Sequence, residues 1–94
     1  SAASDVYKRQ LVYDIACAKR IPKALKTCRK YLRWIQNSVF EGELTYTQFN
    51  RLKNELTKII NKKEDSVIVF CSRNTELVDR QVLGVEKNEK TYFI

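Results

Sequence analysis

The stretch QNSVFEGELT, residues 36–45, decides the fold because it is extended while the segments on both sides of it are helical. Before it, apolar residues recur at three- and four-residue intervals, which predicts an amphipathic helix. These residues are Ile21, Leu25, Cys28, Leu32 and Ile35. After it, Thr45-x-x-Gln48 matches a capping box, the pattern that satisfies the free backbone N–H groups where a helix begins. The second helix has its own apolar stripe at Phe49, Leu52, Leu56, Ile59 and Ile60.

Along the sequence, one strand is expected before the first helix and further strands after the second. Leu11–Ile15 and Ser66–Cys71 are rich in β-branched and aromatic residues, and a final short strand is expected at Arg80–Val85. The order strand, helix, extended stretch, helix, strand is that of a ferredoxin-like split βαβ domain. We therefore expect an α+β fold with a four- to five-stranded antiparallel sheet and two helices on one face.

The strands expected at 11–15 and 66–71 are apolar on both of their faces. In the strand at 66–71, Val67 and Val69 alternate with Ile68 and Phe70. Two helices cover only one face of such a sheet, so the other apolar face needs a partner. The sequence therefore predicts a homodimer that packs sheet against sheet.

Composition limits the kinds of partner. The 94 residues contain 18 Lys and Arg against 11 Asp and Glu, and the formal charge of +7 favours a polyanion such as nucleic acid. No apolar run approaches the roughly 18 residues of a membrane span, and no signal-peptide core precedes the first strand. Histidine and C-x-x-C pairs are absent, so a structural zinc site is not expected. We expect a soluble intracellular protein with no membrane partner.

The periodicity divides the chain into three parts. Residues 1–10 show neither helical nor strand periodicity and are interpreted as a non-native or disordered leader. Residues 11–85 are expected to form the ferredoxin-like domain. The mostly polar residues 86–94 are interpreted as a C-terminal tail. The segment 81–94 adds a strand to its own sheet, adds one to the sheet of a second subunit, or docks on another partner, and the sequence leaves these three alternatives open.

The first helix carries the strongest charge pattern in the chain. Its cations follow one another without an intervening acid, and at about 100° per residue nearly all of them lie opposite the apolar stripe. Charged faces are usually only solvated, but a basic face without i,i+4 carboxylates favours an external anion. We predict that it contacts a phosphate backbone without reading sequence. The predicted nucleic-acid-binding residues are Lys19, Arg20, Lys23, Lys26, Lys30 and Arg33, with Arg73 and Arg80 near the last strands.

Asp14 is the only acidic residue inside an apolar strand. An unpaired carboxylate in such a place costs free energy to desolvate and needs a cation, a metal or solvent nearby. The residues alone leave two interpretations open. Asp14 is a site residue, or it lies at the exposed end of the strand and caps the following loop.

Three separated blocks of this sequence resemble the CRISPR-associated protein 2 family. They are LVYDI at 11–15, QNSVFEGELT at 36–45 and DSVIVF at 65–70, and the resemblance extends from about Leu11 to Gly84. Members of that family form small dimers that work beside the CRISPR integrase when new spacers are captured from foreign DNA, and many are described as metal-dependent nucleases. The resemblance implies a cytoplasmic protein of a prokaryote.

The resemblance also implies a site. In the family, an aspartate at the position of Asp14, next to the tyrosine matched by Tyr13, is contributed by both subunits, and the pair holds a divalent ion across the dimer. An ion shared in this way is of the Mg²⁺ or Mn²⁺ kind, and its role is open between catalysis and structure or regulation. Ser38 and Phe40 match weaker candidates for the nuclease surface, although Phe40 is a core residue by its type. Where the family often has an arginine, this chain has Trp34.

Two functions therefore compete. The first is a non-catalytic homodimeric scaffold that bridges subunits of the integrase, CRISPR-associated protein 1, and binds double-stranded prespacer DNA through the basic helix. The second is a metal-dependent endonuclease that cleaves RNA or DNA with paired Asp14 residues, using Tyr, Lys or metal-bound water as acid or base because histidine is absent. An RNA-binding sheet of the RRM type fits the fold but lacks the aromatic, glycine-rich strand of such domains. The sequence favours the scaffold.

Overall fold

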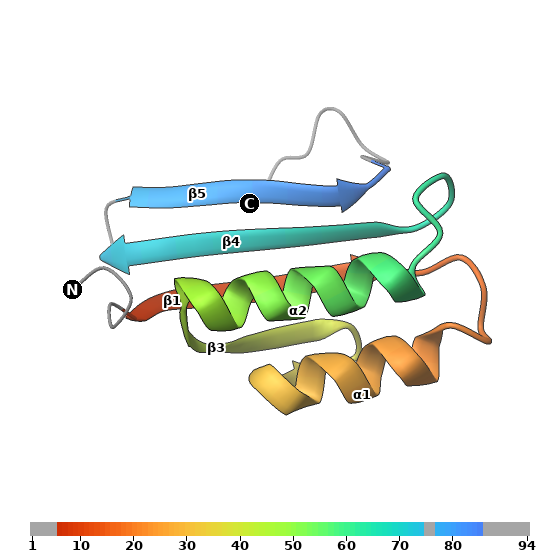
Figure 1. Ribbon diagram of the computed structural model, residues 1–94, viewed down its shortest axis with the longest axis horizontal. Coiled ribbons are helices and arrows are strands. Elements are labelled where there is room, and N and C mark those ends of the chain that lie inside the picture. The colour runs from red at the N-terminus through yellow and green to blue at the C-terminus, as the bar shows by residue number, and fades with distance from the viewer. Residues whose placement is uncertain (1–5, 75–76, 86–94) are drawn as a thin grey trace.

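The computed structural model describes residues 6–74 and 77–85, with side chains described at 6–72 and 81–85 (Figure 1). The predicted tail at 86–94 lies outside this range, as do residues 1–5 of the predicted leader. The elements are β1 (Val6–Asp14), α1 (Ile21–Tyr31), β2 (Arg33–Gln36), β3 (Val39–Thr45), α2 (Tyr46–Ile59), β4 (Ser66–Asn74) and β5 (Leu77–Gly84).

The strands form one sheet in the order β2-β3-β1-β4-β5, and every neighbouring pair is antiparallel. Both helices lie on the same face of this sheet, as Figure 1 shows. The predicted ferredoxin-like α+β fold, with a five-stranded antiparallel sheet and two helices on one face, is confirmed. We call the side away from the helices the open face. Its burial in a homodimer remains a prediction.

β1 begins at Val6, five residues earlier than expected. Residues 6–10 pair with β3, and from Lys8 onward β1 also pairs with β4, so this segment belongs to the sheet. Its strand pattern was missed because the buried position is occupied by a charged residue, Arg9, which is 4% exposed. The guanidinium lies over the ring of Phe49, 3.8 Å from the centroid. Arg9 thus occupies a position where an apolar side chain is expected, and its cation–π contact with Phe49 stabilises it there.

The extended stretch between the helices is a β-hairpin. β2 and β3 pair around Asn37, whose φ of 42° lies in the left-handed region that asparagine tolerates. The start of β2 ends α1 at Tyr31, so the helix is shorter than the run of basic residues. Lys19 and Arg20 precede the helix, and Arg33 lies in β2.

The second hairpin, β4–β5, is longer than predicted. β4 continues to Asn74 and β5 starts at Leu77, with Ser72 paired to Val78 and Asn74 to Leu77. The polar end of β4 has no apolar pattern that would reveal this pairing. At its open end Gly84 has a φ of +89°, and a Cβ on this residue would lie 2.2 Å from the carbonyl oxygen of Asp65. The close approach of the two backbones requires glycine at this position.

The capping box predicted for α2 is confirmed. The hydroxyl of Thr45 accepts from the backbone N–H of Gln48 at 3.1 Å, and the amide oxygen of Gln48 accepts from the backbone N–H of Thr45 at 2.9 Å. Such a cap stabilises a helix by about 1 kcal/mol. It places Phe49, Leu52 and Leu56 against the sheet, where each is 2% exposed or less.

The core lies between the helices and one face of the central strands. β1 contributes Leu11 and Tyr13, and β4 contributes Val67 and Val69. The open face carries the alternate residues of the same strands, of which Ile68 is half-buried in the single chain. The open face of β4 is apolar at Ile68 and Phe70, as the sequence predicts, whereas β1 places Lys8, Gln10 and Asp14 on that face beside Val12.

Candidate metal site and nucleic-acid interface

Asp14 is the last residue of β1 and is exposed on the open face. Its register partner in β4 is Ser66, and on the other side the backbone N–H of Tyr13 donates to the carbonyl oxygen of Ser38 at 3.2 Å. Asp14 and Ser38 therefore lie at the same end of the sheet. A molecule that covers the open face reaches the Asp14 carboxylate from outside.

Tyr13 and Phe40 lie on the opposite side of the sheet from Asp14. Their rings pack at 5.6 Å between centroids, and the two residues are 6% and 0% exposed. Burial, with a smaller contribution from Cys28, raises the pKa of the Tyr13 phenol. Within one chain, the structure therefore does not bring these two side chains to the carboxylate, and both belong to the core.

Asp14 fits a metal ion shared between two chains better than a metal site formed within one chain. Among the described residues, no group of three or more Asp, Glu, Cys or His side chains is placed to hold a metal ion. Mg²⁺ and Mn²⁺ are bound with few carboxylates and several waters. If the predicted homodimer brings the open faces together, one Asp14 from each of two chains would supply these carboxylates.

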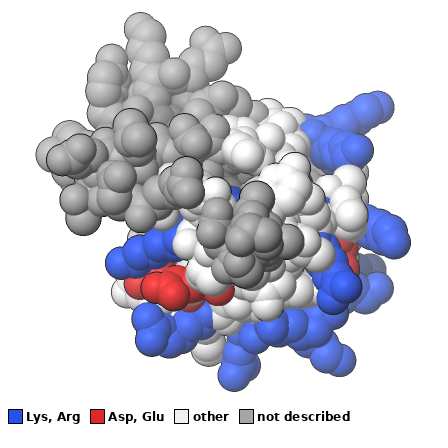
Figure 2. Space-filling model, turned by 60° about the vertical axis from the view of Figure 1, so that its left-hand side comes forward, with Lys and Arg blue, Asp and Glu red and all other residues white. Residues whose placement is uncertain are grey.

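Three of the predicted nucleic-acid-binding residues are exposed and make no ion pair within the described part of the chain. They are Lys19 in the turn before α1 and Lys23 and Lys26 on the helix. Figure 2 shows basic side chains along the lower edge of the molecule, the level at which Figure 1 places α1. A surface of this kind attracts phosphate groups.

Arg20 has a different role, because its partner is a buried carboxylate. Its Nε donates to Asp65 at 2.8 Å, and Asp65 is 0% exposed. The backbone N–H groups of Ala16 and Asn61 also donate to Asp65, each at 2.8 Å. Burial alone raises the pKa of the Asp65 carboxyl, but the bonds from Arg20, Asn61 and Ala16 outweigh it and lower the pKa to about 2. Arg20 and Asp65 thus connect the start of α1 to the end of α2.

Two further predicted cations have carboxylate partners on other elements. Lys30 donates to Glu55 of α2, to which Tyr31 also donates, and the hydrogen bond with Glu55 is the main cause that raises the pKa of Lys30. Arg33 lies 3.8 Å from Glu41 of β3. The acids that the first helix lacks in sequence are supplied by the tertiary structure, so the basic face is smaller than predicted.

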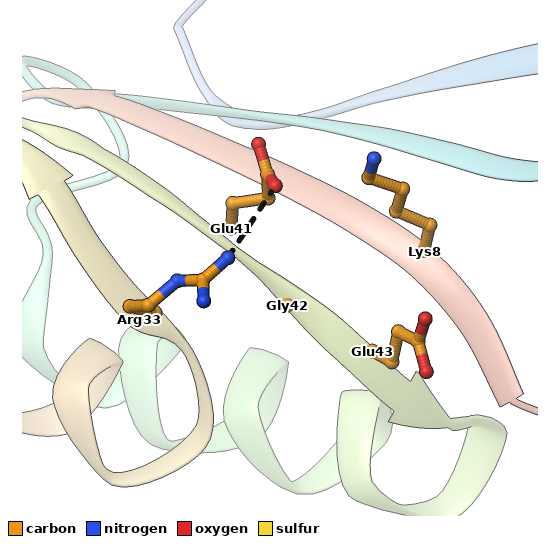
Figure 3. A pocket seen from close by; sticks show the side chains of 5 residues that line it. All are labelled: Lys8, Arg33, Glu41, Gly42 and Glu43. Carbon is orange, nitrogen blue, oxygen red and sulfur yellow. Dashed lines mark ion pairs between the residues drawn. The ribbon is translucent and has the colours of Figure 1, made fainter.

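A shallow hollow of about 450 Å³ opens beside Arg33 at the edge of the open face. Figure 3 shows Glu41 and Glu43 of β3 along it, with Arg33 facing Glu41 and Lys8 of β1 on the far side. Two acids and two bases balance each other in this hollow. It is therefore a polar part of the open face and not an anion-binding site.

The remaining site predictions fall where side chains are not described. Arg73 lies in β4 and Arg80 in β5, and the structure gives only the backbone at both positions.

Sequence reasoning did not identify Asp65 as a buried partner of Arg20. The partners of Asp65 on the β1–α1 connection are 45 and 49 residues away, so no local pattern reveals the contact. It also missed the exposed indole of Trp34, which is 46% exposed. A tryptophan that follows a run of basic residues could have indicated that Trp34 is a candidate contact residue.

Comparison with known proteins gives consistent results. A model of the family described as CRISPR associated protein Cas2 matches residues 9–78. A protein of Dictyoglomus turgidum named CRISPR-associated endoribonuclease Cas2 is 54% identical over 84 residues, which cover 89% of this chain and 95% of that protein. A protein of the same name from Thermotoga maritima is 46% identical over 83 residues, or 88% of this chain and 94% of that one.

A solved structure shows the same architecture. The crystal structure described as that of cas2 is similar with a TM-score of 0.70 and 32% sequence identity. The match covers 96% of this chain and 100% of the other. No helix in the described residues is long and apolar enough to cross a membrane.

Proposed function

Because the chain belongs to the CRISPR-associated Cas2 family, we propose that it acts in CRISPR adaptation as a homodimeric scaffold. In this proposal the dimer bridges subunits of the CRISPR-associated integrase and binds the prespacer duplex through its basic helices. The observation that carries the proposal is the set of exposed lysines at and before α1, Lys19, Lys23 and Lys26, which make no ion pair in the described part of the chain.

These lysines suit a phosphate backbone better than a small anion. Lys23 and Lys26 are three residues apart on α1, which places their side chains about one helical turn of 5.4 Å apart, and Lys19 lies in the turn just before the helix. Such a row contacts a linear array of charges and carries no base-reading geometry. If both subunits contribute, six cations contact phosphates, and the slope of log K against log salt is expected to be roughly −5.

The surroundings of Asp14 support a non-catalytic role. The carboxylate lies on the open face, whereas Tyr13 and Phe40 are buried on the other face. General acid–base catalysis needs a group within hydrogen-bond reach of the reacting atoms. Neither of these two residues meets that condition in a single chain.

Spacer integration by the purified integrase tests the scaffold. The charge-reversed protein Lys19→Glu, Lys23→Glu, Lys26→Glu is expected to abolish integration and duplex binding, and Asp14→Asn is expected to retain both. The control reverses the charges of Arg51, Lys58 and Lys62, three exposed cations on and just after α2. This control protein is expected to retain most of the integration activity. Loss of integration in Asp14→Asn, with the dimer and DNA binding intact, would contradict the proposal.

A second function, a metal-dependent endoribonuclease, is favoured by the names of the relatives and by the exposed position of Asp14. In this reading the paired Asp14 residues hold Mg²⁺ or Mn²⁺, which lowers the pKa of a bound water and makes it a nucleophile. Cleavage of a labelled RNA is then abolished both by a chelator and by Asp14→Asn. Glu43→Gln, which removes another exposed carboxylate of the open face, retains the cleavage. Equal activity of Asp14→Asn and the unchanged protein would exclude this site.

A further inference from the structure

Trp34 is a large apolar side chain that the fold leaves in solvent. It lies in β2, the edge strand next to β3, and it is on the same face of the sheet as its register partner, the buried Phe40. Nevertheless it is 46% exposed. Large exposed aromatic residues mark interaction sites more often than smaller apolar residues do.

The indole is held in place before any partner binds. Its Nε1–H donates to the carbonyl oxygen of Asn37 at 2.9 Å, in the turn of its own hairpin. The guanidinium carbon of Arg29 on α1 lies over the ring, 5.7 Å from the centroid. The ring therefore has a fixed orientation and a cation beside it, and binding does not need to order a mobile side chain.

Arg29 also belongs to a hollow on α1. This hollow has a volume of about 420 Å³ and is lined by Pro22, Leu25, Lys26, Arg29 and Lys30. No acidic side chain is among the residues that line it. Arg29 thus lines the hollow and also lies over the exposed indole.

A partner that covers this place must satisfy both the aromatic ring and the cations. An apolar protein surface would desolvate Lys26 and Arg29 without pairing them, which is costly. An unpaired nucleotide offers a flat base for the indole and a phosphate for the cations. Bases inside a duplex are stacked on each other and do not present a face to Trp34.

We infer that Trp34 is a stacking platform for an unpaired base of a nucleic-acid strand whose phosphates lie in the basic hollow of α1. This inference rests on the proposed function, since it adds a single-stranded contact to a protein proposed to bind a duplex. The bound chemistry is a single strand of DNA or RNA, or the frayed end of a duplex. Bases of all four kinds are accepted because each has a π face.

The chain contains one tryptophan and five tyrosines, so emission excited at a wavelength that only tryptophan absorbs reports on Trp34 alone. A twelve-nucleotide single strand is expected to quench this emission, and a blunt duplex of the same sequence is expected to bind with little quenching. DNA and RNA strands are titrated in parallel to identify the preferred sugar. An emission that no single strand changes overturns the inference.

Substitutions separate stacking from charge. In an anisotropy assay with a labelled strand, Trp34→Ala is expected to weaken single-strand binding about tenfold or more, while Trp34→Phe retains part of it and duplex affinity stays unchanged. The control is Tyr46→Ala, which removes another aromatic side chain, 60% exposed, from the far helix. Equal single-strand affinity of Trp34→Ala and the unchanged protein overturns the inference, provided that circular dichroism shows the fold to be intact.

The failures of the two proposals can be distinguished. If the duplex binds but Trp34→Ala has no effect on the single strand, only the stacking platform is wrong. If neither nucleic acid binds, the proposed scaffold function fails as well. If Trp34→Ala and Ile35→Ala both weaken binding of the integrase while oligonucleotides leave the emission unchanged, Trp34 is a protein contact and the inference is wrong.

Discussion

The two faces of the sheet use the same strands but differ in what covers them. Under the helices, Leu11 and Phe40 are 1% and 0% exposed. On the open face, their neighbours Val12 and Val39 are half-buried in the single chain. The open face also carries charged residues, among them Asp14. The covered face therefore supplies most of the buried apolar contacts of the chain, and the open face, still partly apolar, is the surface predicted to pack against a second copy.

The largest effect is expected from a cavity in the covered face. Phe40→Ala removes a fully buried ring that packs on Tyr13, and the free energy of unfolding is expected to fall by about 3–5 kcal/mol. Val39→Ala, the neighbouring change on the open face, is expected to cost much less in the monomer. Urea denaturation at low protein concentration measures both. Similar losses for the two variants would show that the faces do not differ as described.

A charge on the open face is expected to act on association and not on folding. Ile68→Asp places a carboxylate in the centre of the surface predicted to pack against a second copy, and should weaken the dimer by about 100-fold or more. Helix content, measured by circular dichroism, should not change. Tyr46→Asp, an exposed change on the helix side, is the control. Sedimentation of Ile68→Asp as a dimer would place the interface elsewhere.

A smaller loss is expected when the buried carboxylate between the helices is removed. Asp65→Asn keeps the volume but cannot accept all the bonds from Arg20, Asn61 and Ala16, so the free energy of unfolding should fall by about 2–3 kcal/mol. Glu64→Gln is the matched control, because Glu64 also pairs with Arg20 but its side chain is 53% exposed. It should have a much smaller effect. Equal losses for the two variants would contradict the structural role of Asp65.

The sequence revealed those parts of the fold whose signal is local. The helix that starts at the Thr45–Gln48 capping box and the apolar strand from Ser66 both have patterns within a few residues, and both are confirmed. Arg9 broke the strand pattern because a cation stands at a buried position, over an aromatic ring from a distant helix. No single-sequence pattern predicts that contact.

The basic residues show the same limit at the candidate site. Their succession predicted one continuous face, yet Arg20 and Lys30 pair with acids that are 45 and 25 residues away. Only the tertiary structure separates these from the exposed lysines. The metal site predicted at Asp14 would need a carboxylate from a second chain.

The smallest effect on stability is expected from lowering the pH. This change tests the buried contact of Asp65 without altering the shape of the side chain. The pKa of Asp65 is lowered from 3.8 to about 2, so between these values the unfolded chain binds more protons than the folded one. The stabilisation is therefore complete above about pH 4 and is lost as the pH falls towards 2. Melting temperatures of the unchanged protein and Asp65→Asn should converge over this range, because protonated Asp65 accepts fewer hydrogen bonds, as the amide does. Parallel curves from pH 6 to pH 2 would show that the Asp65 carboxylate contributes no pH-dependent stability, and that the connection between the helices rests on packing alone.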